Sequence, residues 1–258
     1  MKPEKIDVVI PTYNQTDLLL EAVNSCNEQT WPVNKIFIVD DGSDERVKKW
    51  LVDTFSDSGH IKLIFNDHTG LPALGRALGV SHSQAEWIAY LDADDTWHPM
   101  KIELQMKLAI EKEVDFIYTN ASTVIDGAEG ASLFNYLPKR LNFLNLARTN
   151  WVVNSSVLIR RRTLEQVGYA TSKRVRGAED YATWLRVACY SRMMGIDKNL
   201  TRYRILENSL SRSETFDPRV YAYVDFLLWT KTRTDIRQSR LKMMRFLVLL
   251  RVIHQYGI

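Results

Sequence analysis

Short apolar runs alternate with longer amphipathic segments along the first half of the chain. Five runs of five or six residues are rich in Val, Ile, Leu and Phe, and they occupy residues 6–10, 34–39, 61–65, 86–91 and 114–119. Segments with helical periodicity follow the first four runs. This alternation predicts βα units and a mainly parallel central sheet, buried on both faces and flanked by helices. We therefore expect the α/β fold class.

The pattern of the second half is less regular. Residues 126–132 predict a loop, residues 151–159 a strand and residues 178–193 a helix. Residues 201–213 indicate the end of a strand and a loop, and the chain is helical in pattern from Asp217 onward.

A polar loop follows each of the first four predicted strands, and the loops contain PTYN, DDGS, NDHTG and DADD. Right-handed crossovers place the carboxyl ends of parallel strands at one edge of the sheet, where open α/β sheets bind ligands. We therefore expect the four loops to converge on one crevice. No GxGxxG follows the first strand and no GxxxxGK[ST] is present, which disfavours a Rossmann dinucleotide site and a P-loop NTPase.

Composition and charge narrow the class of protein. The chain has 258 residues, of which 45% are hydrophobic and 25% charged, an ordinary globular balance. Residues 231–258 carry a charge of +6, which leaves −3 for the rest, so we do not expect a nucleic-acid-binding protein. No apolar run reaches the ~18 residues of a membrane span and the N-terminus lacks a signal-peptide core, which favours a cytoplasmic protein. Cys26 and Cys189 suit a reducing compartment.

Three carboxylates, Asp92, Asp94 and Asp95, lie within four positions at the end of the fourth predicted strand. Like charges this close raise one another's pKa unless something relieves the repulsion. In one interpretation, Asp95 or Thr96 caps the following helix. In the other, Asp92 and Asp94 point the same way along an extended backbone and bind Mn²⁺ or Mg²⁺ through their oxygens.

Five motifs carry a resemblance to a known family: IPTYN, VDDGSDE, YLDADDTWHPMKIE, GAEDYATWLR and YRILENSLS. In this order, over residues 6–213, they resemble the motifs of family 2 glycosyltransferases (GT2) with a GT-A fold. The resemblance implies a Rossmann-like nucleotide-diphospho-sugar transferase domain over residues 1–213. Its donor-nucleotide half would be residues 1–120 and its acceptor half residues 121–213, with residues 214–258 as a basic, amphipathic helical extension.

The resemblance also implies which residues bind the sugar-nucleotide donor. Asp41 would hydrogen-bond the base, which favours uridine, while Asp40 shapes the turn. Asp94 would bind the metal directly, and Asp92 would contact the ribose or the sugar. The expected donor-binding residues are Pro11, Thr12, Tyr13, Asn14, Asp40, Asp41, Gly70, Arg76, Asp92, Ala93 and Arg204, and the expected metal ligands are Asp94 and Asp92.

In the family, the aspartate of the ED pair is the catalytic base, which here is Asp180 beside Glu179. The acceptor hydroxyl must lose its proton on the face of the sugar opposite the leaving diphosphate, and a carboxylate can take it there. The charge of Glu179 would raise the pKa of Asp180. The competing interpretation is an acidic first turn of a helix. Trp97 and His98 are expected to contact the acceptor, although a core Trp and a solvated His fit equally well.

The chain departs from the family pattern at two points. Ala77 stands where Asn usually follows the arginine, here Arg76, and QxxRW, the mark of processive synthases, is absent. We therefore expect transfer of a single sugar.

The basic C-terminal segment permits two interpretations. An apolar helical stripe between basic flanks is predicted within residues 231–253, and it consists of Ile236, Met243, Phe246, Leu247, Leu250 and Ile253. Such a helix lies in a membrane interface, at the inner face for a cytoplasmic protein, or packs on the domain with a solvated basic rim.

The sequence thus predicts an inverting, metal-dependent glycosyltransferase that uses Mn²⁺ or Mg²⁺. It would move one hexose or N-acetylhexosamine from a nucleotide-sugar, favoured as a UDP-sugar, to a saccharide or lipid-linked saccharide in surface-polysaccharide or glycan assembly. One alternative is a nucleotidyltransferase, which should carry a phosphate-binding Gly/Lys/Arg loop after its first strand. The other is a non-catalytic sugar-nucleotide-binding protein, which should lack the base Asp180.

Overall fold

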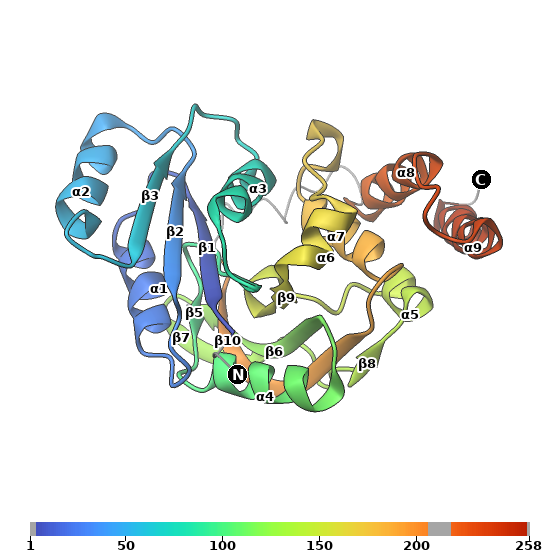
Figure 1. Ribbon diagram of the computed structural model, residues 1–258, viewed down its shortest axis with the longest axis horizontal. Coiled ribbons are helices and arrows are strands. Elements are labelled where there is room, and N and C mark those ends of the chain that lie inside the picture. The colour runs from blue at the N-terminus through green and yellow to red at the C-terminus, as the bar shows by residue number, and fades with distance from the viewer. Residues whose placement is uncertain (1–3, 206–217, 257–258) are drawn as a thin grey trace.

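The structure, a computed structural model, describes residues 4–205 and 218–256 (Figure 1). Its first half is the predicted series of βα units. The elements are β1 (Ile6–Thr12), α1 (Asp17–Asn27), β2 (Lys35–Asp40), α2 (Glu45–Phe55), β3 (Ile61–Phe65), α3 (Pro72–His82) and β4 (Trp87–Tyr90). Parallel pairs join β1 to β2, β1 to β4 and β2 to β3. The predicted strands and their parallel pairing are confirmed in this half.

The second half mixes short strands with helices and two 3-10 turns. The elements are β5 (Thr96–Trp97), α4 (Lys101–Lys112), β6 (Phe116–Ile125), β7 (Ala128–Ser132), β8 (Arg140–Leu141), α5 (Phe143–Arg148), η1 (Asn154–Ser156), β9 (Leu158–Arg160), α6 (Arg161–Val167), η2 (Lys173–Val175), α7 (Glu179–Val187) and β10 (Met193–Arg204). Two helices follow, α8 (Pro218–Lys231) and α9 (Gln238–Tyr256).

All strands described belong to one sheet, whose main path runs β3-β2-β1-β4-β9-β6-β10-β5. The short strand β9 is antiparallel to both β4 and β6, so β6 runs in the direction of β4, and β10 is parallel to β6. Every antiparallel pair among the described strands includes one of the short strands β5, β7, β8 and β9. The carboxyl ends of the other strands therefore share one edge, as predicted, and the α/β fold class is confirmed.

The loop predicted over residues 126–132 is wrong. This segment forms a turn and strand β7, which pairs with β6 as a hairpin. Asp126 and Gly127 both have positive φ, at 50° and 80°, and an Asp-Gly pair in this conformation closes a tight hairpin. The DG dipeptide was the available signal.

Two other predictions in this half are wrong in detail. The predicted strand over 151–159 is interrupted by η1, where the Ser156 hydroxyl donates to the carbonyl oxygen of Val153 (2.7 Å), and only its end belongs to β9. The predicted helix over 178–193 ends at Val187.

Successive side chains of the central strands enter two cores, one on each face of the sheet. In β1, Val9 belongs to a core formed with α5 to α9, whereas Val8 and Ile10 belong to a core formed with α1, α2 and α4. Strands β2 and β4 alternate in the same way. Cys26 and Cys189 are both free and buried.

The two C-terminal helices pack on the core that α5 and α7 also share. Their buried side chains are Ala222, Tyr223 and Phe226 of α8 and Leu241, Met244 and Val248 of α9. In the predicted stripe, Met243 and Phe246 are 56% and 59% exposed, and the side chains of Leu250 and Ile253 lie outside the described residues. Helix α9 therefore packs on the domain through another face, and a membrane contact of the exposed face stays a prediction. Within the described residues, no helix has both the length and the apolar character needed to cross a membrane.

The contact of α3 with β1 depends on Gly79. A Cβ at this position would lie 2.4 Å from Cγ1 of Val9. We expect Gly79→Ala to lower the free energy of unfolding by about 1–3 kcal/mol through overpacking, although alanine by itself favours a helix by up to about 1 kcal/mol over glycine. Urea unfolding measures the change.

Gly59→Ala is the matched control, because a Cβ there would meet nothing within 4 Å. If Gly79→Ala proves as stable as the wild type, the close packing of α3 on β1 is not a constraint on the fold.

Candidate active site

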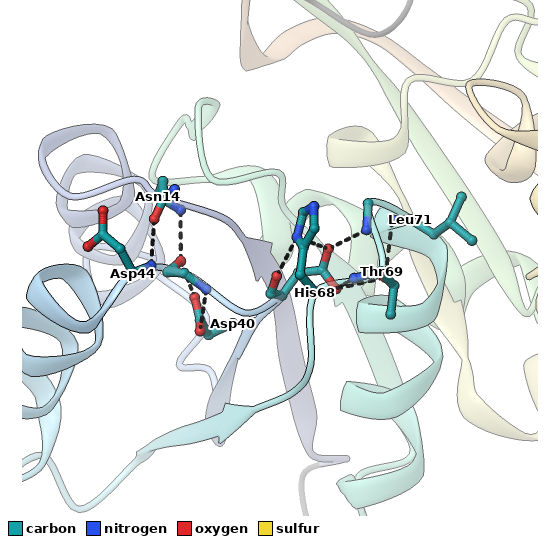
Figure 2. A network of polar contacts seen from close by, with 9 residues as sticks. Asn14, Asp40, Asp44, His68, Thr69 and Leu71 are labelled. Atoms are coloured by element: carbon teal, nitrogen blue, oxygen red, sulfur yellow. Dashed lines mark hydrogen bonds and ion pairs between the residues drawn. The ribbon is translucent and has the colours of Figure 1, made fainter.

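The turns after β1 and β2 hold each other at the carboxyl edge of the sheet (Figure 2). Asp40 is buried, and its carboxylate accepts hydrogen bonds from the backbone N–H (3.0 Å) and the hydroxyl of Ser43. Ser43 Oγ accepts from the N–H of Asn14 (2.8 Å), and Asn14 Oδ1 accepts from the N–H of Asp44 (2.9 Å). Two of the residues predicted to bind the donor, Asn14 and Asp40, therefore shape these turns.

Asp41 organises the loop after β3. Its carboxylate accepts from the N–H (3.0 Å) and hydroxyl (2.7 Å) of Thr69 and from the N–H of Gly70 (2.8 Å). His68 Nδ1 lies 2.8 Å from the Asp41 carbonyl oxygen. Gly42 permits this approach, because its φ is +74° and a Cβ there would lie 2.5 Å from the backbone nitrogen of His68. Asp41 Oδ2 also lies 3.3 Å from His68 Nδ1, so a ligand donor at this carboxylate would lie beside the His68 ring.

An aromatic side chain lies over this loop. The Tyr13 ring is 47% exposed and stacks on His68 with 4.3 Å between ring centroids. Thr12, beside it, is buried, and its hydroxyl has no hydrogen-bond partner within the described part of the chain. Pro11 packs on α3, where a Cβ at Gly75 would lie 3.3 Å from the proline Cβ. A flat exposed ring beside a carboxylate suits a nucleobase.

A buried ion pair connects α3 to the end of β4. Arg76 Nη2 lies 2.5 Å from Asp92 Oδ1, and the Arg76 side chain is only 8% exposed. Asn154 Nδ2 donates to the same oxygen (3.2 Å), and the Tyr169 hydroxyl donates to Asn154 Oδ1 (3.4 Å). This network engages Asp92 Oδ1, so Oδ2 is the oxygen of Asp92 that a ligand can use.

Asp95 has a structural role. It is buried, and its carboxylate accepts from the Ser155 hydroxyl (2.5 Å) and from the backbone N–H of Arg204 (2.9 Å). It therefore ties the turn after β4 to β10. The helix-cap interpretation is wrong, because β5 intervenes and α4 begins at Lys101 with Met100 at its N-cap.

Asp94 is the carboxylate of the cluster best placed for a cation. Burial and the charge of Asp92 raise its pKa to about 6. Among the residues that the structure describes, no three His, Cys, Asp or Glu side chains form a metal-binding group. Mg²⁺ commonly takes one or two carboxylates and completes its shell with water and substrate phosphates. Asp94 and the Oδ2 atom of Asp92 fit the protein side of such a site.

Glu179 and Asp180 begin α7 beside the Arg76–Asp92 pair. Burial raises the pKa of Asp180 to about 6, and the charge of Glu179 adds to this, as the sequence predicted. The charges of Asp92 and Arg76 also act on the Asp180 pKa, in opposite directions. The first turn of α7 therefore shares one site with the end of β4.

Two residues predicted to contact the acceptor differ in their surroundings. Trp97 is 4% exposed in the hydrophobic core, and its Nε1 donates to the carbonyl oxygen of Ser155 (2.7 Å). The prediction for Trp97 is therefore wrong, because the pairing of β5 with β10 buries the ring. His98 is exposed, its Nδ1 accepts from the N–H of Met100 (3.1 Å), and its acceptor role stays a prediction.

Two predicted donor-binding residues have other contacts. Arg204 Nη2 pairs with Glu21 of α1 (2.8 Å), although the Arg204 charge still lowers the pKa of Asp94. The Ala93 side chain is 7% exposed and packs in the core, so the backbone is what it offers a ligand. The motif YRILENSLS lies outside the described residues from Leu206 onward.

Sequence reasoning missed three residues of the site: Asn154, Ser155 and Tyr169. None belongs to a motif that carried the resemblance. The three polar residues NSS inside an otherwise apolar segment were the one available signal for Asn154 and Ser155.

Comparison with known proteins places this chain in a family. The profile of Glycosyl transferase family 2 matches residues 7–168. TuaG of Bacillus subtilis, named for teichuronic acid biosynthesis, is 26% identical over 81% of this chain and 82% of TuaG. WfgD of Escherichia coli, a UDP-Glc:alpha-D-GlcNAc-diphosphoundecaprenol beta-1,3-glucosyltransferase, is 22% identical over 81% of this chain and 80% of WfgD. A glycosyltransferase of Rickettsia conorii is 28% identical, and this chain spans 35% of its length.

Solved structures share the fold. S. aureus TarS 1–349 in complex with UDP-GlcNAc superposes with a TM-score of 0.76 at 18% identity, over 97% of this chain and 73% of that one. The complex with UDP gives a TM-score of 0.71 at 17% identity, over 97% and 72%. The prediction of a GT-A fold is confirmed. With the family profile matching more than half of its length, the chain belongs to glycosyl transferase family 2 and is a glycosyltransferase.

Proposed function

We propose that this protein is an inverting, metal-dependent glycosyltransferase that moves one sugar from a UDP-sugar to an acceptor hydroxyl. One observation carries the proposal: Asp180 of the acceptor half and Asp92 and Asp94 of the donor half meet around Arg76. A base and a cation-binding carboxylate at one crevice are what this transfer requires.

The edge of the sheet supports binding of the nucleotide. The Tyr13 ring provides a stacking surface, and the Asp41 carboxylate beside it would accept from an imide N–H in place of His68. Uracil carries such an N–H, which favours uridine over cytidine. The titles of the TarS structures name UDP and UDP-GlcNAc as ligands of that protein, and we extend this donor class to the present chain.

Asp94 and Asp92 Oδ2 would hold Mn²⁺ or Mg²⁺. A bound cation supplies positive charge to the leaving diphosphate, so no general acid is needed there. The raised pKa of Asp94 supports this assignment, because a carboxylate destabilised by burial and by Asp92 gains most from a cation.

Asp180 would accept the proton of the attacking hydroxyl. With a pKa of about 6, it is ionised at neutral pH yet basic enough to take a proton as the new bond forms. Attack from the Asp180 side, opposite the cation and the diphosphate, inverts the anomeric carbon.

For the acceptor we propose only a chemical class, a saccharide or lipid-linked saccharide in polysaccharide assembly. The names of TuaG and WfgD support this class, since WfgD acts on a diphosphoundecaprenol-linked sugar. A peripheral membrane contact through residues 231–253 stays a prediction that rests on the exposed Met243 and Phe246 of α9.

The first test concerns the cation. We expect Mn²⁺ with UDP to raise the melting temperature of the wild type by about 5 °C at saturating ligand. Asp94→Ala should abolish the rise, because the cation loses its main protein ligand. Asp53→Ala, an exposed change on α2, is the matched control and should keep the rise. An unchanged melting curve for the wild type would sink the proposal.

The second test concerns the base. Asp180→Asn keeps the shape of the side chain but cannot accept the proton. We expect it to bind UDP with normal affinity and to lose transfer by roughly 10² or more, measured as sugar transfer to a panel of saccharide acceptors. A variant with a near-normal rate would refute the role of Asp180.

The third test uses the raised pKa of Asp180. The native carboxylate has a pKa of about 6, above the reference value of 3.8. The contribution of Asp180 to wild-type stability therefore falls as pH rises from about 4 to about 6, because ionisation of this carboxyl is disfavoured in the native state. Asp180→Asn lacks this penalty, so we expect it to be equal to the wild type near pH 4 and more stable by about 1–3 kcal/mol at pH 7. Urea unfolding in EDTA measures this, and a difference independent of pH would contradict it.

A further inference from the structure

Arg176 brings a positive charge from the acceptor half to the nucleotide side of the crevice. It lies in the segment between η2 and α7, four residues before Asp180. Its guanidinium reaches the loop after β3: a Cβ built on Gly70 would lie 3.7 Å from Arg176 Nη2 and 4.0 Å from its Cζ. The two segments are far apart in sequence, so this contact spans the two halves of the site.

The contact point is the loop that Asp41 holds. The Gly70 N–H donates to the Asp41 carboxylate (2.8 Å). The Cβ position built on Gly70, which lies close to the Arg176 guanidinium, also lies 3.8 Å from Nε2 of His68. Gly70 has a φ of +66° and no side chain, so it leaves the space beside Arg176 open. The guanidinium therefore lies within a few ångströms of the loop that contributes to the candidate nucleobase site at Asp41 and Tyr13.

Charge at the site makes Arg176 distinctive. The crevice gathers five acidic side chains, which are Asp92, Asp94, Asp95, Glu179 and Asp180. Arg76 is paired with Asp92, and Arg204 is paired with Glu21. Arg176 is exposed and forms no ion pair with any residue that the structure describes. As far as the described residues show, this guanidinium is available for an anionic ligand.

We propose that Arg176 binds the phosphate groups of the donor nucleotide, closing on them from the acceptor half. The inference rests on the proposed function, because it requires a nucleotide at Asp41 and Tyr13. A guanidinium offers paired N–H groups that match phosphate oxygens and bind them more strongly than neutral acceptors. A nucleobase edge is uncharged, so a guanidinium would bind it less strongly than it binds a phosphate group.

This contact also bears on transfer. The reaction breaks the bond between the anomeric carbon and the diphosphate oxygen, and the electron pair stays on that oxygen. The acceptor oxygen forms the new bond to carbon and gives its proton to Asp180. Negative charge on the diphosphate therefore grows during the step, and a guanidinium at the phosphates stabilises it. Arg176 is thus expected to contribute both to donor affinity and to the rate of transfer.

The experiment compares UDP with uridine, since the two ligands differ only in the phosphates. Affinities of both, with Mn²⁺ present, are measured by calorimetry or ligand-observed NMR for the wild type, Arg176→Ala and Arg176→Lys. Arg174→Ala is the matched control, an exposed arginine on the neighbouring 3-10 turn. Because Arg176 is exposed, all variants should melt with the wild type, and melting curves check this.

We expect Arg176→Ala to weaken UDP binding about tenfold or more and to leave uridine binding within about twofold. Arg176→Lys should retain part of the UDP affinity, and Arg174→Ala should retain all of it. Unchanged UDP affinity in Arg176→Ala overturns the inference, as does an equal loss for UDP and uridine. A wild type that binds none of UDP, GDP and dTDP overturns the proposed function together with this inference, so the two failures are distinguishable.

Discussion

The ion pair between Arg76 and Asp92 is the contact on which the site depends. It joins helix α3 to the end of strand β4, and both partners are largely removed from solvent. A buried charge that loses its partner costs about 3–5 kcal/mol, so the pair fixes α3 against the strand end. The second half of the chain is arranged around the same two charges: Asn154 donates to Asp92, and both charges act on the Asp180 pKa. The two halves of the chain therefore meet at one electrostatic centre.

The direction of the strands explains why so many acids gather there. Strands β1, β2 and β4 end at one edge of the sheet, and each end carries a turn whose polar side chains satisfy one another. The carboxylates of Asp40 and Asp95 accept hydrogen bonds in this way, from Ser43 in one turn and from Ser155 and a backbone N–H in the other. Asp94 carries a raised pKa, because burial and the charge of Asp92 outweigh its backbone hydrogen bond and the charges of Arg204 and Arg76. Burial beside Asp94 and Asp92 raises the pKa of Asp95 as well, but the Asp95 oxygens are engaged by Ser155 and Arg204, which leaves Asp94 for a ligand.

The predictable part of this architecture came from patterns that are local in sequence. Short apolar runs specify the first four strands, and the polar turns follow directly from the strand ends. Asn154, Ser155 and Tyr169 were missed because their roles arise from pairing between distant segments, which no local pattern encodes. Trp97 shows the same limit: its position after an acidic turn suggested a ligand contact, but the pairing of β5 with β10 places it in the core. Met243 and Phe246 fit the predicted helical stripe, but α9 packs on the core through a different face.

Asp94 and Asp180 are electrostatically coupled through Asp92, since the charge of Asp92 raises the pKa of both. Positive charge placed beside Asp92 and Asp94 would therefore lower both pKa values. Asp180 would then be more fully ionised with such a charge bound than without it. Without that charge, burial and the charge of Glu179 oppose ionisation of Asp180. Like-charge repulsion in the acidic cluster thus links the ionisation of Asp180 to any positive charge that binds beside Asp92 and Asp94.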